Sequence, residues 1–528
     1  LVTADMAKRM KAGAVIVDFE KFDKNIIAYA KAINPKSDFG GVLADMKKDM
    51  GIAPWIDFTK PVGMAQPSLQ GGEPILWATI PNFKEKVKTV PDAKEEDGIW
   101  FLPFAEKEDL YATMKGDMVI AGRDKTVLES ALKKEGRTLA DDLRPRLDLM
   151  ANRDLYLHLN FDPVRPMALA GIAQASQMAP MMAMMAAQQG GGDPASMTAV
   201  FAGVLDAVKN FVEQGAFLDI ALGITSTSAD ATIAAGFKDG EIKNYLTKNK
   251  PASASLLTTF EEQPFTMAMA WQIPGDDSPF LNYLFDKMGS VPPGGAAPAA
   301  GEKSAGAEGA EIARDLYRKV EGMDLVMHMT KEGMTSAGDY LGKDVAGIQD
   351  LAKKSMVKEN PIAAMMSSGI SYEAAGSKKL GDKNVDQMAI KIDTSNPAAA
   401  HATKMFGPNT TLYMGPMEGR VGYYLGPEAE AQKYFTGKVA KPFASGALIA
   451  EALNTLPAKR NLVILVDPAS VLPAVGPLLG MELPGNIPPG PPVAISTSLS
   501  GDYARTDIHV PAKAISRVVE AVTPQPPT

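Results

Sequence analysis

Apolar and polar positions follow one another along this chain in a unit that recurs. A short apolar strand is followed by an acidic or polar turn and then by a helix with hydrophobic residues on one face. The unit occupies Ala14–Ile33, Asp154–Ile172, Phe265–Phe285, Met323–Leu341 and Asn461–Gly480. In two copies the strand ends in Asp-Pro, at Asp162-Pro163 and Asp467-Pro468, and we expect this Asp to cap the helix that follows.

The neighbours of these copies repeat as well. A strand, a Gly-containing turn and a helix follow Gly116 and again Gly419. The blocks Gly215–Leu246 and Pro491–Val522 both alternate apolar and polar residues, turn at a polar site, return as a strand and end in a helix.

This repetition predicts two homologous halves, residues 1–250 and 251–528. Each half is expected to be α+β, with an antiparallel sheet and helices packed on one face. A stretch rich in Gly, Ala and Pro at about 291–311 cannot bury a core, so we expect a flexible loop there.

Charge and cysteine content narrow the functional classes. The net charge of −8 argues against a nucleic-acid-binding protein, which would carry a basic surface. The chain has no cysteine, which excludes disulfides, thiolate zinc sites and cysteine nucleophiles. Zero cysteine in 528 residues and a chain that starts at Leu1 fit an exported bacterial protein, and we expect a signal peptide to have been removed.

Motifs for catalysis or cofactor binding are missing from the sequence. No serine lies in a G-x-S-x-G turn, and no G-x-G-x-x-G follows a predicted strand. His158 and His328 occupy similar places in two copies of the unit, and we interpret both as polar positions on half-solvated strands. His401 and His509 have no recognisable partners. We therefore predict that the protein is not an enzyme and has no catalytic, cofactor-binding or metal-binding residues.

The stretch "MAPMMAMMAAQQGGG" at Met178–Gly192 is the least usual part of the chain. Met178, Met181, Met182 and Met185 fall at helical positions i, i+3, i+4 and i+7, which places them on one face. Three interpretations fit: packing in the core or at a subunit interface, contact with a hydrophobic ligand or membrane surface, and Cu(I) binding by thioethers. No histidine lies near, which argues against copper, and we favour packing in the core or at a subunit interface over contact with a ligand or membrane surface. These four methionines are the candidate face for contact with a partner or another hydrophobic surface.

The same region raises the question of a membrane span. Residues 166–192 carry no charge. Pro180 and several glutamines interrupt them, and alanine is commoner than leucine. We expect no transmembrane helix here, because a span needs about 20 strongly apolar residues.

One stretch has a family resemblance, "MVIAGRDKTVLESALKKEGRTLADDLRPRLDLMANRDLYLHLNFDP". Its residues Val119–Gly122, Leu139–Asp142 and Asp154–Asp162 resemble a pattern in exported bacterial proteins of the DUF3352 type from planctomycete-like bacteria. The resemblance implies a periplasmic or extracellular location in the cell envelope. It implies no activity, because the family has no catalytic residues to transfer.

Together these features predict a non-catalytic structural or interaction protein, a scaffold of the bacterial cell envelope. Its expected partner is another protein or a further copy of itself, with no nucleic acid involved. Contact with a membrane surface would suit the methionines, though without a span. The alternative function is a carrier or sensor of a hydrophobic small molecule or lipid, since sheets with helices on one face can enclose an apolar cavity.

Overall fold

The structure is a computed structural model of the 528-residue chain. It describes residues 13–17, 19–36, 55–66, 74–103, 109–132, 149, 153–190, 194–249, 251, 257–272, 278–289, 305–330, 333–357, 370–392, 403, 406–407, 410–475, 489–499 and 501–522. The chain forms two compact units, which are described separately. Unit 1 contains residues 1–167, 215–238 and 505–516, and unit 2 contains residues 168–214, 239–504 and 517–528.

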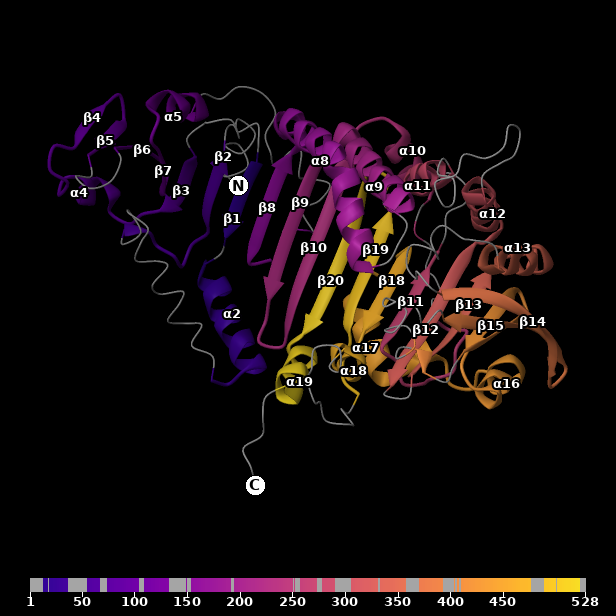
Figure 1. The fold of residues 1–528 in the computed structure, drawn as a ribbon. Coiled ribbons are helices and arrows are strands. Elements are labelled where there is room, and N and C mark those ends of the chain that lie inside the picture. Colours follow the sequence, from indigo (N-terminus) through magenta and orange to yellow (C-terminus); the bar gives the residue numbers. More distant parts are fainter. Residues whose placement is uncertain are drawn as a thin grey trace. The chain divides into compact units, whose positions relative to one another are not determined.

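Unit 1 is an antiparallel sheet with short helices (Figure 1). Its strands are β1 (Gly13–Val17), β2 (Val62–Gln66), β3 (Ile75–Thr79), β4 (Lys94–Glu96), β5 (Ile99–Leu102), β6 (Leu110–Lys115), β7 (Met118–Gly122), β8 (Leu155–Asn160), β9 (Gly215–Ile224), β10 (Ser228–Phe237) and most of β20 (Tyr503–Pro511). Its helices are α2 (Phe19–Ile33), α4 (Phe83–Val87) and α5 (Lys125–Leu132).

Unit 2 has a second antiparallel sheet and most of the helices. Its strands are β11 (Met267–Trp271), β12 (Gly322–Thr330), β13 (Gly333–Leu341), β14 (Ile370–Leu380), β15 (Lys383–Ile392), β16 (Thr411–Met417), β17 (Arg420–Leu425), β18 (Leu462–Val466) and β19 (Val493–Leu499). Its helices are α9 (Pro194–Gln214), α10 (Glu241–Lys248), α11 (Pro279–Gly289), α12 (Ala305–Lys319), α13 (Val345–Val357), α16 (Glu428–Thr436), η4 (Phe443–Ser445), α17 (Ala447–Thr455) and α18 (Pro468–Val475). Helices α8 (Phe161–Gly190) and α19 (Ala512–Val522) contribute residues to both units.

The strand order demonstrates the internal duplication. Neighbouring strands in unit 1 run β4-β5-β6-β7-β3-β2-β1-β8-β9. In unit 2 they run β14-β15-β16-β17-β13-β12-β11-β18-β19, which is the same order with each number raised by ten. All these pairs are antiparallel, so the predicted α+β class with two homologous halves is confirmed.

Most copies of the predicted strand-and-helix unit are present. The copies beginning at Ala14, Asp154, Phe265 and Asn461 form β1–α2, β8–α8, β11–α11 and β18–α18. At the last of these the predicted cap is present, because Asp467 Oδ1 accepts a hydrogen bond from the backbone N–H of Ala469 at 3.2 Å.

The prediction of a strand followed by a helix at Met323–Leu341 is wrong, because these residues form the hairpin of β12 and β13. Its second arm is rich in Thr, Ser, Gly and Tyr, which favour strand pairing or turns over helix.

The two compact units do not divide the chain at the predicted boundary, residue 250. Two segments away from this boundary belong to the other unit than predicted. Residues 168–214 belong to unit 2, and residues 505–516 belong to unit 1, where β20 pairs with β10. The bounds of the two halves, 1–250 and 251–528, therefore remain a prediction from the sequence repeat. Most of the predicted loop at 291–311 lies outside the described residues, but α12 begins at Ala305, so its last part is helical.

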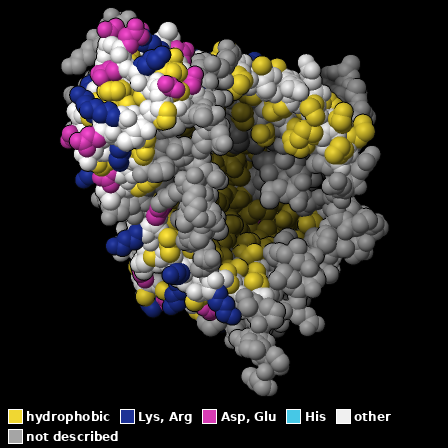
Figure 2. Space-filling view, turned by 90° about the vertical axis from the view of Figure 1, so that its left-hand side faces the viewer, with side chains coloured by type: hydrophobic (Ala, Val, Ile, Leu, Met, Phe, Trp, Pro, Cys, Tyr) yellow, Lys and Arg dark blue, Asp and Glu magenta, His cyan; other side chains and the backbone are white. Residues whose placement is uncertain are grey.

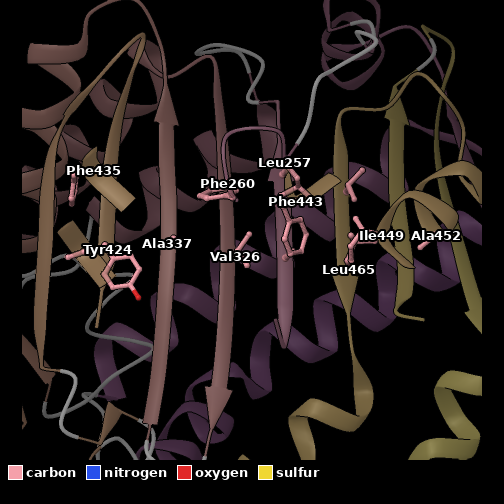
Figure 3. Close-up of a cluster of buried hydrophobic side chains, with 14 of the residues drawn as sticks. Leu257, Phe260, Val326, Ala337, Tyr424, Phe435, Phe443, Ile449, Ala452 and Leu465 are labelled. Carbon is pink, nitrogen blue, oxygen red and sulfur yellow. The ribbon is translucent and has the colours of Figure 1, made fainter. Parts of the chain in front are cut away.

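Helices cover the sheet of unit 2 on both faces. On one face the core contains Ile348 and Ala352 of α13 with Met414 and Val421 of the sheet. The opposite face packs against α16 and α17, with Tyr424, Phe435, Phe443, Ile449 and Leu465 among its buried side chains (Figure 3). Neighbouring residues of β16, such as Tyr413 and Met414, belong to different cores because side chains alternate along a strand. The sequence had placed helices on one face only; α16 and α17 add the second layer.

Close packing between β2 and β3 makes one glycine sensitive to substitution. Trp77 is fully buried and lies over Gly63, so a Cβ atom at residue 63 would be 2.0 Å from Trp77 Cε2. We expect Gly63→Ala to cost about 1–3 kcal/mol, because the indole ring must leave its position. Thermal unfolding and the near-ultraviolet circular dichroism of the buried indole would measure this.

Gly171 is the matched control for that substitution. It lies within α8, and no atom lies within 4 Å of a Cβ added there. Gly171→Ala should therefore be neutral or stabilising by up to about 1 kcal/mol through helix propensity. Equal unfolding temperatures for the two variants would contradict the packing argument.

Candidate functional site

Helix α8 carries the methionines, and it begins directly after strand β8. Asn160 Oδ1 accepts a hydrogen bond from the backbone N–H of Asp162 at 3.0 Å, which satisfies a free donor of the first turn. Asn160 is therefore the N-cap residue of α8, and the prediction that Asp162 caps this helix was wrong. Asp162 instead pairs with Lys238 and accepts a hydrogen bond from Arg165 Nη1 at 2.7 Å. The hydrogen bond from Lys238 holds the pKa of Asp162 below its usual value.

The two faces of α8 differ in solvent exposure, and this difference shows whether the methionines pack in the core. Ala179 and Ala183 are buried, with 4% and 0% of their surface exposed. The predicted contact residues point the other way: Met178, Met181, Met182 and Met185 are 45%, 61%, 45% and 55% exposed. We call these four residues the methionine face. They do not pack in the core of this chain, because the small alanines take the inner side of the helix.

Charge is absent from the whole outer part of the helix. Residues 166–190 contain no Lys, Arg, Asp or Glu, and Met184 and Met167 are exposed as well. In Figure 2 hydrophobic side chains gather in a patch at the upper right, with no charged side chain visible among them. Among the described residues, no helix has the length and apolar character needed to cross a membrane.

Helix α9 also leaves apolar side chains exposed. Val204 and Val208 share a helical face with Phe211 and Val212. Val212 is buried, but Val204 and Val208 are 40% and 43% exposed. Helix α9 packs against α11, and its outer valines remain exposed.

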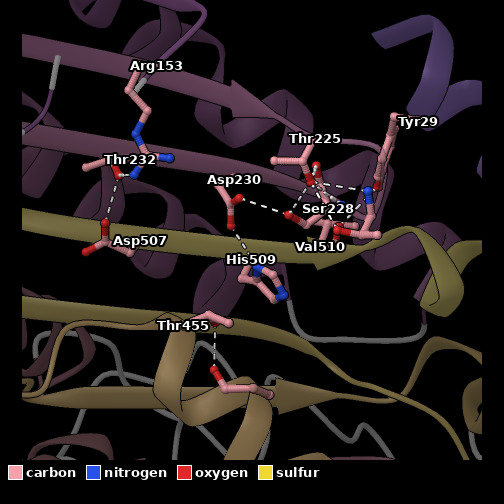
Figure 4. Close-up of polar contacts among 12 residues, drawn as sticks. Tyr29, Arg153, Thr225, Ser228, Asp230, Thr232, Thr455, Asp507, His509 and Val510 are labelled. Carbon is pink, nitrogen blue, oxygen red and sulfur yellow. Dashed lines mark hydrogen bonds and ion pairs between the residues drawn. The ribbon is translucent and has the colours of Figure 1, made fainter. Parts of the chain in front are cut away.

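Two histidine–aspartate pairs lie on one face of the unit 1 sheet. His158 Nδ1 lies 2.6 Å from Asp219 Oδ1, across the register of β8 and β9. His509 Nδ1 lies 2.6 Å from Asp230 Oδ1, between β20 and β10 (Figure 4). The expectation that His509 has no partner was therefore wrong. His401 lies outside the described residues.

The chemistry of these pairs is limited by their neighbours. An imidazole oriented by a carboxylate can act as a general base when a nucleophile bonds its other nitrogen. Here Ser228 Oγ donates to Asp230 Oδ2 at 3.1 Å and so bonds the carboxylate rather than the imidazole. Burial acts to raise the pKa of Asp230, but the hydrogen bond and charge of His509 hold it below its usual value.

Further polar bonds on this face join strands that are far apart in sequence. Thr232 Oγ1 donates to Asp507 Oδ1 at 2.7 Å, and Arg153 Nη2 donates to Thr232 Oγ1 at 3.1 Å (Figure 4). Arg505 binds both carboxylate oxygens of Asp507 from two residues away. Tyr29 of α2 donates to the carbonyl of Val510 at 3.2 Å. This network attaches β20 to β10 and α2, which is a structural role.

Unit 2 contains a buried carboxylate pair that sequence analysis missed. Asp324 of β12 and Asp339 of β13 face each other in register and are 1% and 0% exposed. Arg420 Nε lies 3.1 Å from Asp339 Oδ1, and Tyr434 donates to the same oxygen at 2.6 Å. The backbone N–H of Leu257 donates to Asp324 Oδ2 at 3.2 Å. Burial raises the pKa of Asp324 to about 7 and also raises that of Asp339.

A sequence signal for these carboxylates does exist. Asp219, Asp324 and Asp339 each occupy the buried register of an alternating strand, where an apolar residue is expected. An acidic residue at such a position indicates a buried partner, although the sequence does not say which one. Among the described residues, no group of three or more His, Asp or Glu side chains is arranged to hold a metal ion.

Comparisons with known proteins add little to this geometry. No family model matches the chain, and no curated protein matches it. Two solved structures are similar over part of the chain: crystal forms I and III of TP0453, with TM-scores of 0.23 and 0.21 and 10% identity for both. They cover 45% and 44% of this chain and 79% and 77% of their own. Likeness at this level carries no argument about fold or function.

Proposed function

We propose that this protein is a non-catalytic interaction scaffold of the bacterial cell envelope, and that it binds its partner through the methionine face. The observation that carries the proposal is the orientation of α8, with alanines inward and four methionines outward. Apolar surface left in water costs about 25 cal/mol per Å², so a contiguous patch on a folded protein usually marks a contact site. Flexible thioether side chains suit such a contact because they adapt to the shape of a partner.

Two features support the envelope location in this proposal. The chain lacks cysteine, and Val119–Gly122 and Asp154–Asp162 resemble exported proteins of the DUF3352 type.

The polar clusters support a role without catalysis. Ser228 bonds Asp230 rather than His509, and the carboxylate pair Asp324–Asp339 is shielded from solvent.

The proposal is tested by the size of the native complex in the source cells. The wild-type protein is expected in the envelope fraction, in a particle larger than one chain on native gels. Met182→Glu should release it at monomer size, because a buried unpaired carboxylate strongly opposes association. Leu448→Glu is the matched control, since Leu448 is an exposed leucine on α17, and this variant should keep the complex.

Other outcomes would assign a different function. A wild-type protein that migrates as one chain in gentle extracts would contradict the scaffold. Native mass spectrometry would then test the alternative, a carrier of a hydrophobic small molecule or lipid. If the protein is such a carrier, the wild-type protein should retain the mass of a bound small molecule or lipid, and the Met182→Glu variant should not.

A further inference from the structure

We infer that Asp324 and Asp339 share one proton, and that this proton keeps a neighbouring segment, residues 257–262, closed against the carboxyl pair. We call residues 257–262 the strap. It lies in unit 2 shortly before β11 and belongs to none of the named helices or strands. The inference concerns a different part of the chain from the methionine face and does not depend on the proposed function.

Charge in this buried place balances only when a proton is present. Asp324 and Asp339 face each other in register and are almost fully buried, and the one cation beside them is Arg420, with Nε 3.1 Å from Asp339 Oδ1. The phenols of Tyr423 and Tyr434 also act on the pair, but burial raises their pKa values well above normal, so they stay neutral. Two carboxylates and one guanidinium leave one negative charge away from water, which is strongly unfavourable. One proton neutralises the cluster.

The described elements next to the pair supply no second cation. Strand β11 places Ala270 opposite Asp324, and neither η4 nor α18, which packs against β12, contains a charged residue. The acidic residues of the strap have partners of their own. Glu261 accepts a hydrogen bond from the backbone N–H of Lys441 at 3.0 Å, and Glu262 pairs with the Lys441 ammonium group.

Two buried oxygens without a partner give the position of this proton. Asp339 Oδ1 accepts a hydrogen bond from Tyr434, and Asp324 Oδ2 accepts one from the backbone N–H of Leu257. The second oxygen of each group, Asp324 Oδ1 and Asp339 Oδ2, is buried and has no hydrogen-bond partner. Buried polar atoms nearly always have one, and side chains directly opposite on neighbouring strands are only about 5 Å apart at Cβ. A proton on Asp324 Oδ1, donated to Asp339 Oδ2, satisfies both atoms.

The strap lies between this pair and η4. Leu257 donates its backbone N–H to the pair, and the hydroxyl of Thr259 acts on the pKa of both carboxyl groups, so it lies beside them. The strap carbonyls of Leu257 and Phe260 accept hydrogen bonds from the N–H groups of Ala444 and Phe443, at 3.3 and 2.8 Å. Leu257 has a φ of 62°, in the left-handed region that leucine rarely adopts. A strained segment outside regular structure is expected to open before the strands beside it.

Loss of the proton should open the strap. An ionised Asp324 needs water, and the strap is the part of its cover that can move away to admit it. Burial raises the pKa of Asp324 to about 7 in the closed state, whereas a hydrated Asp has a pKa of about 3.9. Opening therefore releases a proton between pH 4 and pH 7, so the closed strap is most stable below pH 4 and this stabilisation is lost as the pH passes 7.

The consequence is a surface that depends on pH. Leu257 and Phe260 are fully buried while the strap is closed. Opening exposes both side chains, so a rise in pH creates apolar surface in unit 2. With the two pKa values above, the opening equilibrium should increase by roughly 100-fold from pH 5 to pH 8.

Hydrogen–deuterium exchange of the full-length chain, followed by mass spectrometry, tests the opening. After correction for the base catalysis of exchange itself, the protection of strap peptides should fall by roughly 100-fold from pH 5 to pH 8. Peptides from β12 and β13 should stay more strongly protected at both values. Asp324→Asn should remove the pH dependence of the strap, and the exposed-site control Asp350→Asn should retain it.

Infrared spectroscopy of the carboxyl groups tests whether the proton is shared. At pH 6 the wild type should have the carbonyl band of a buried protonated carboxyl group, and this band should disappear as the pH is raised to 8. Asp324→Asn and Asp339→Asn should each remove the band, because the Arg420 guanidinium then balances the one carboxylate that remains. Circular dichroism at each pH checks that the variants are folded.

Three results would overturn the inference. Strap protection that does not change with pH would show that no proton holds the strap closed. An equal loss of protection in the strap, β12 and β13 would show that unit 2 opens as a whole. A carboxyl band that persists in Asp339→Asn would assign the proton to Asp324 alone. If the Asn variants do not fold, the wild-type exchange and infrared series over pH still decide the first two points.

Discussion

Replacing Arg420 with methionine is expected to lower the free energy of unfolding of unit 2 by about 3–5 kcal/mol. Arg420 is the cation beside Asp339, which is fully buried and faces Asp324 across β12 and β13. Methionine keeps much of the side-chain volume but removes the charge. The variant would leave two buried carboxyl groups with only Tyr434, Leu257 and neighbouring polar groups to stabilise them.

Hydrogen exchange of peptides from β12 and β13 would measure the loss within unit 2. The matched control is Lys354→Met on α13, which removes an exposed ion pair with Asp350 and should change stability little. A double variant, Arg420→Met with Asp339→Asn, should recover part of the loss, since no buried charge at residue 339 then lacks its cation. A cost below about 1 kcal/mol for Arg420→Met would contradict the buried-pair argument.

The stability of unit 2 should fall as the pH rises from about 4 to 7. Burial raises the pKa of Asp324 from 3.8 to about 7, so in this window the folded state binds a proton that the unfolded state has released. By linkage, the contribution is fully present below pH 4 and lost once the pH passes 7, and it amounts to at most about 4 kcal/mol. The raised pKa of Asp339 acts in the same direction.

Asp324→Asn isolates this effect, because the amide resembles the protonated carboxyl at every pH. We expect urea unfolding at pH 5 and pH 8 to show a smaller pH dependence for this variant, and greater stability than the wild type at pH 8. Asp350→Asn changes an exposed carboxylate on α13 and should retain the wild-type pH dependence. The same slope in Asp324→Asn and in the wild type would show that residue 324 is not the group that titrates.

Repetition along the chain predicted the duplicated sheet well. The pattern of short apolar strands, polar turns and amphipathic helices depends on neighbouring residues, and the strand order of β1–β9 recurs in β11–β19. The pattern failed at Met323–Leu341, where a strand follows a strand. Periodicity over so few residues does not separate a helix from a second strand, and pairing with β17 supports the strand there.

Helical spacing also identified the methionine face, but not its orientation. The positions of Met178, Met181, Met182 and Met185 show that they share one side of a helix. Whether that side points inward depends on what packs against the helix. The structure buries Ala179 and Ala183 and leaves the methionines exposed.

The sequence by itself determined the strand-and-helix order, the duplication, the charge-free helix and the absence of cysteine, because each depends on local composition or spacing. Only the tertiary structure decided which side of α8 is exposed and that His509 pairs with Asp230. It alone also brought Arg420 to the Asp324–Asp339 pair. The physical reason is the same in each case: these contacts join residues that are neighbours only across a folded sheet, and burial, which sets their energies and pKa values, is a property of the packed chain.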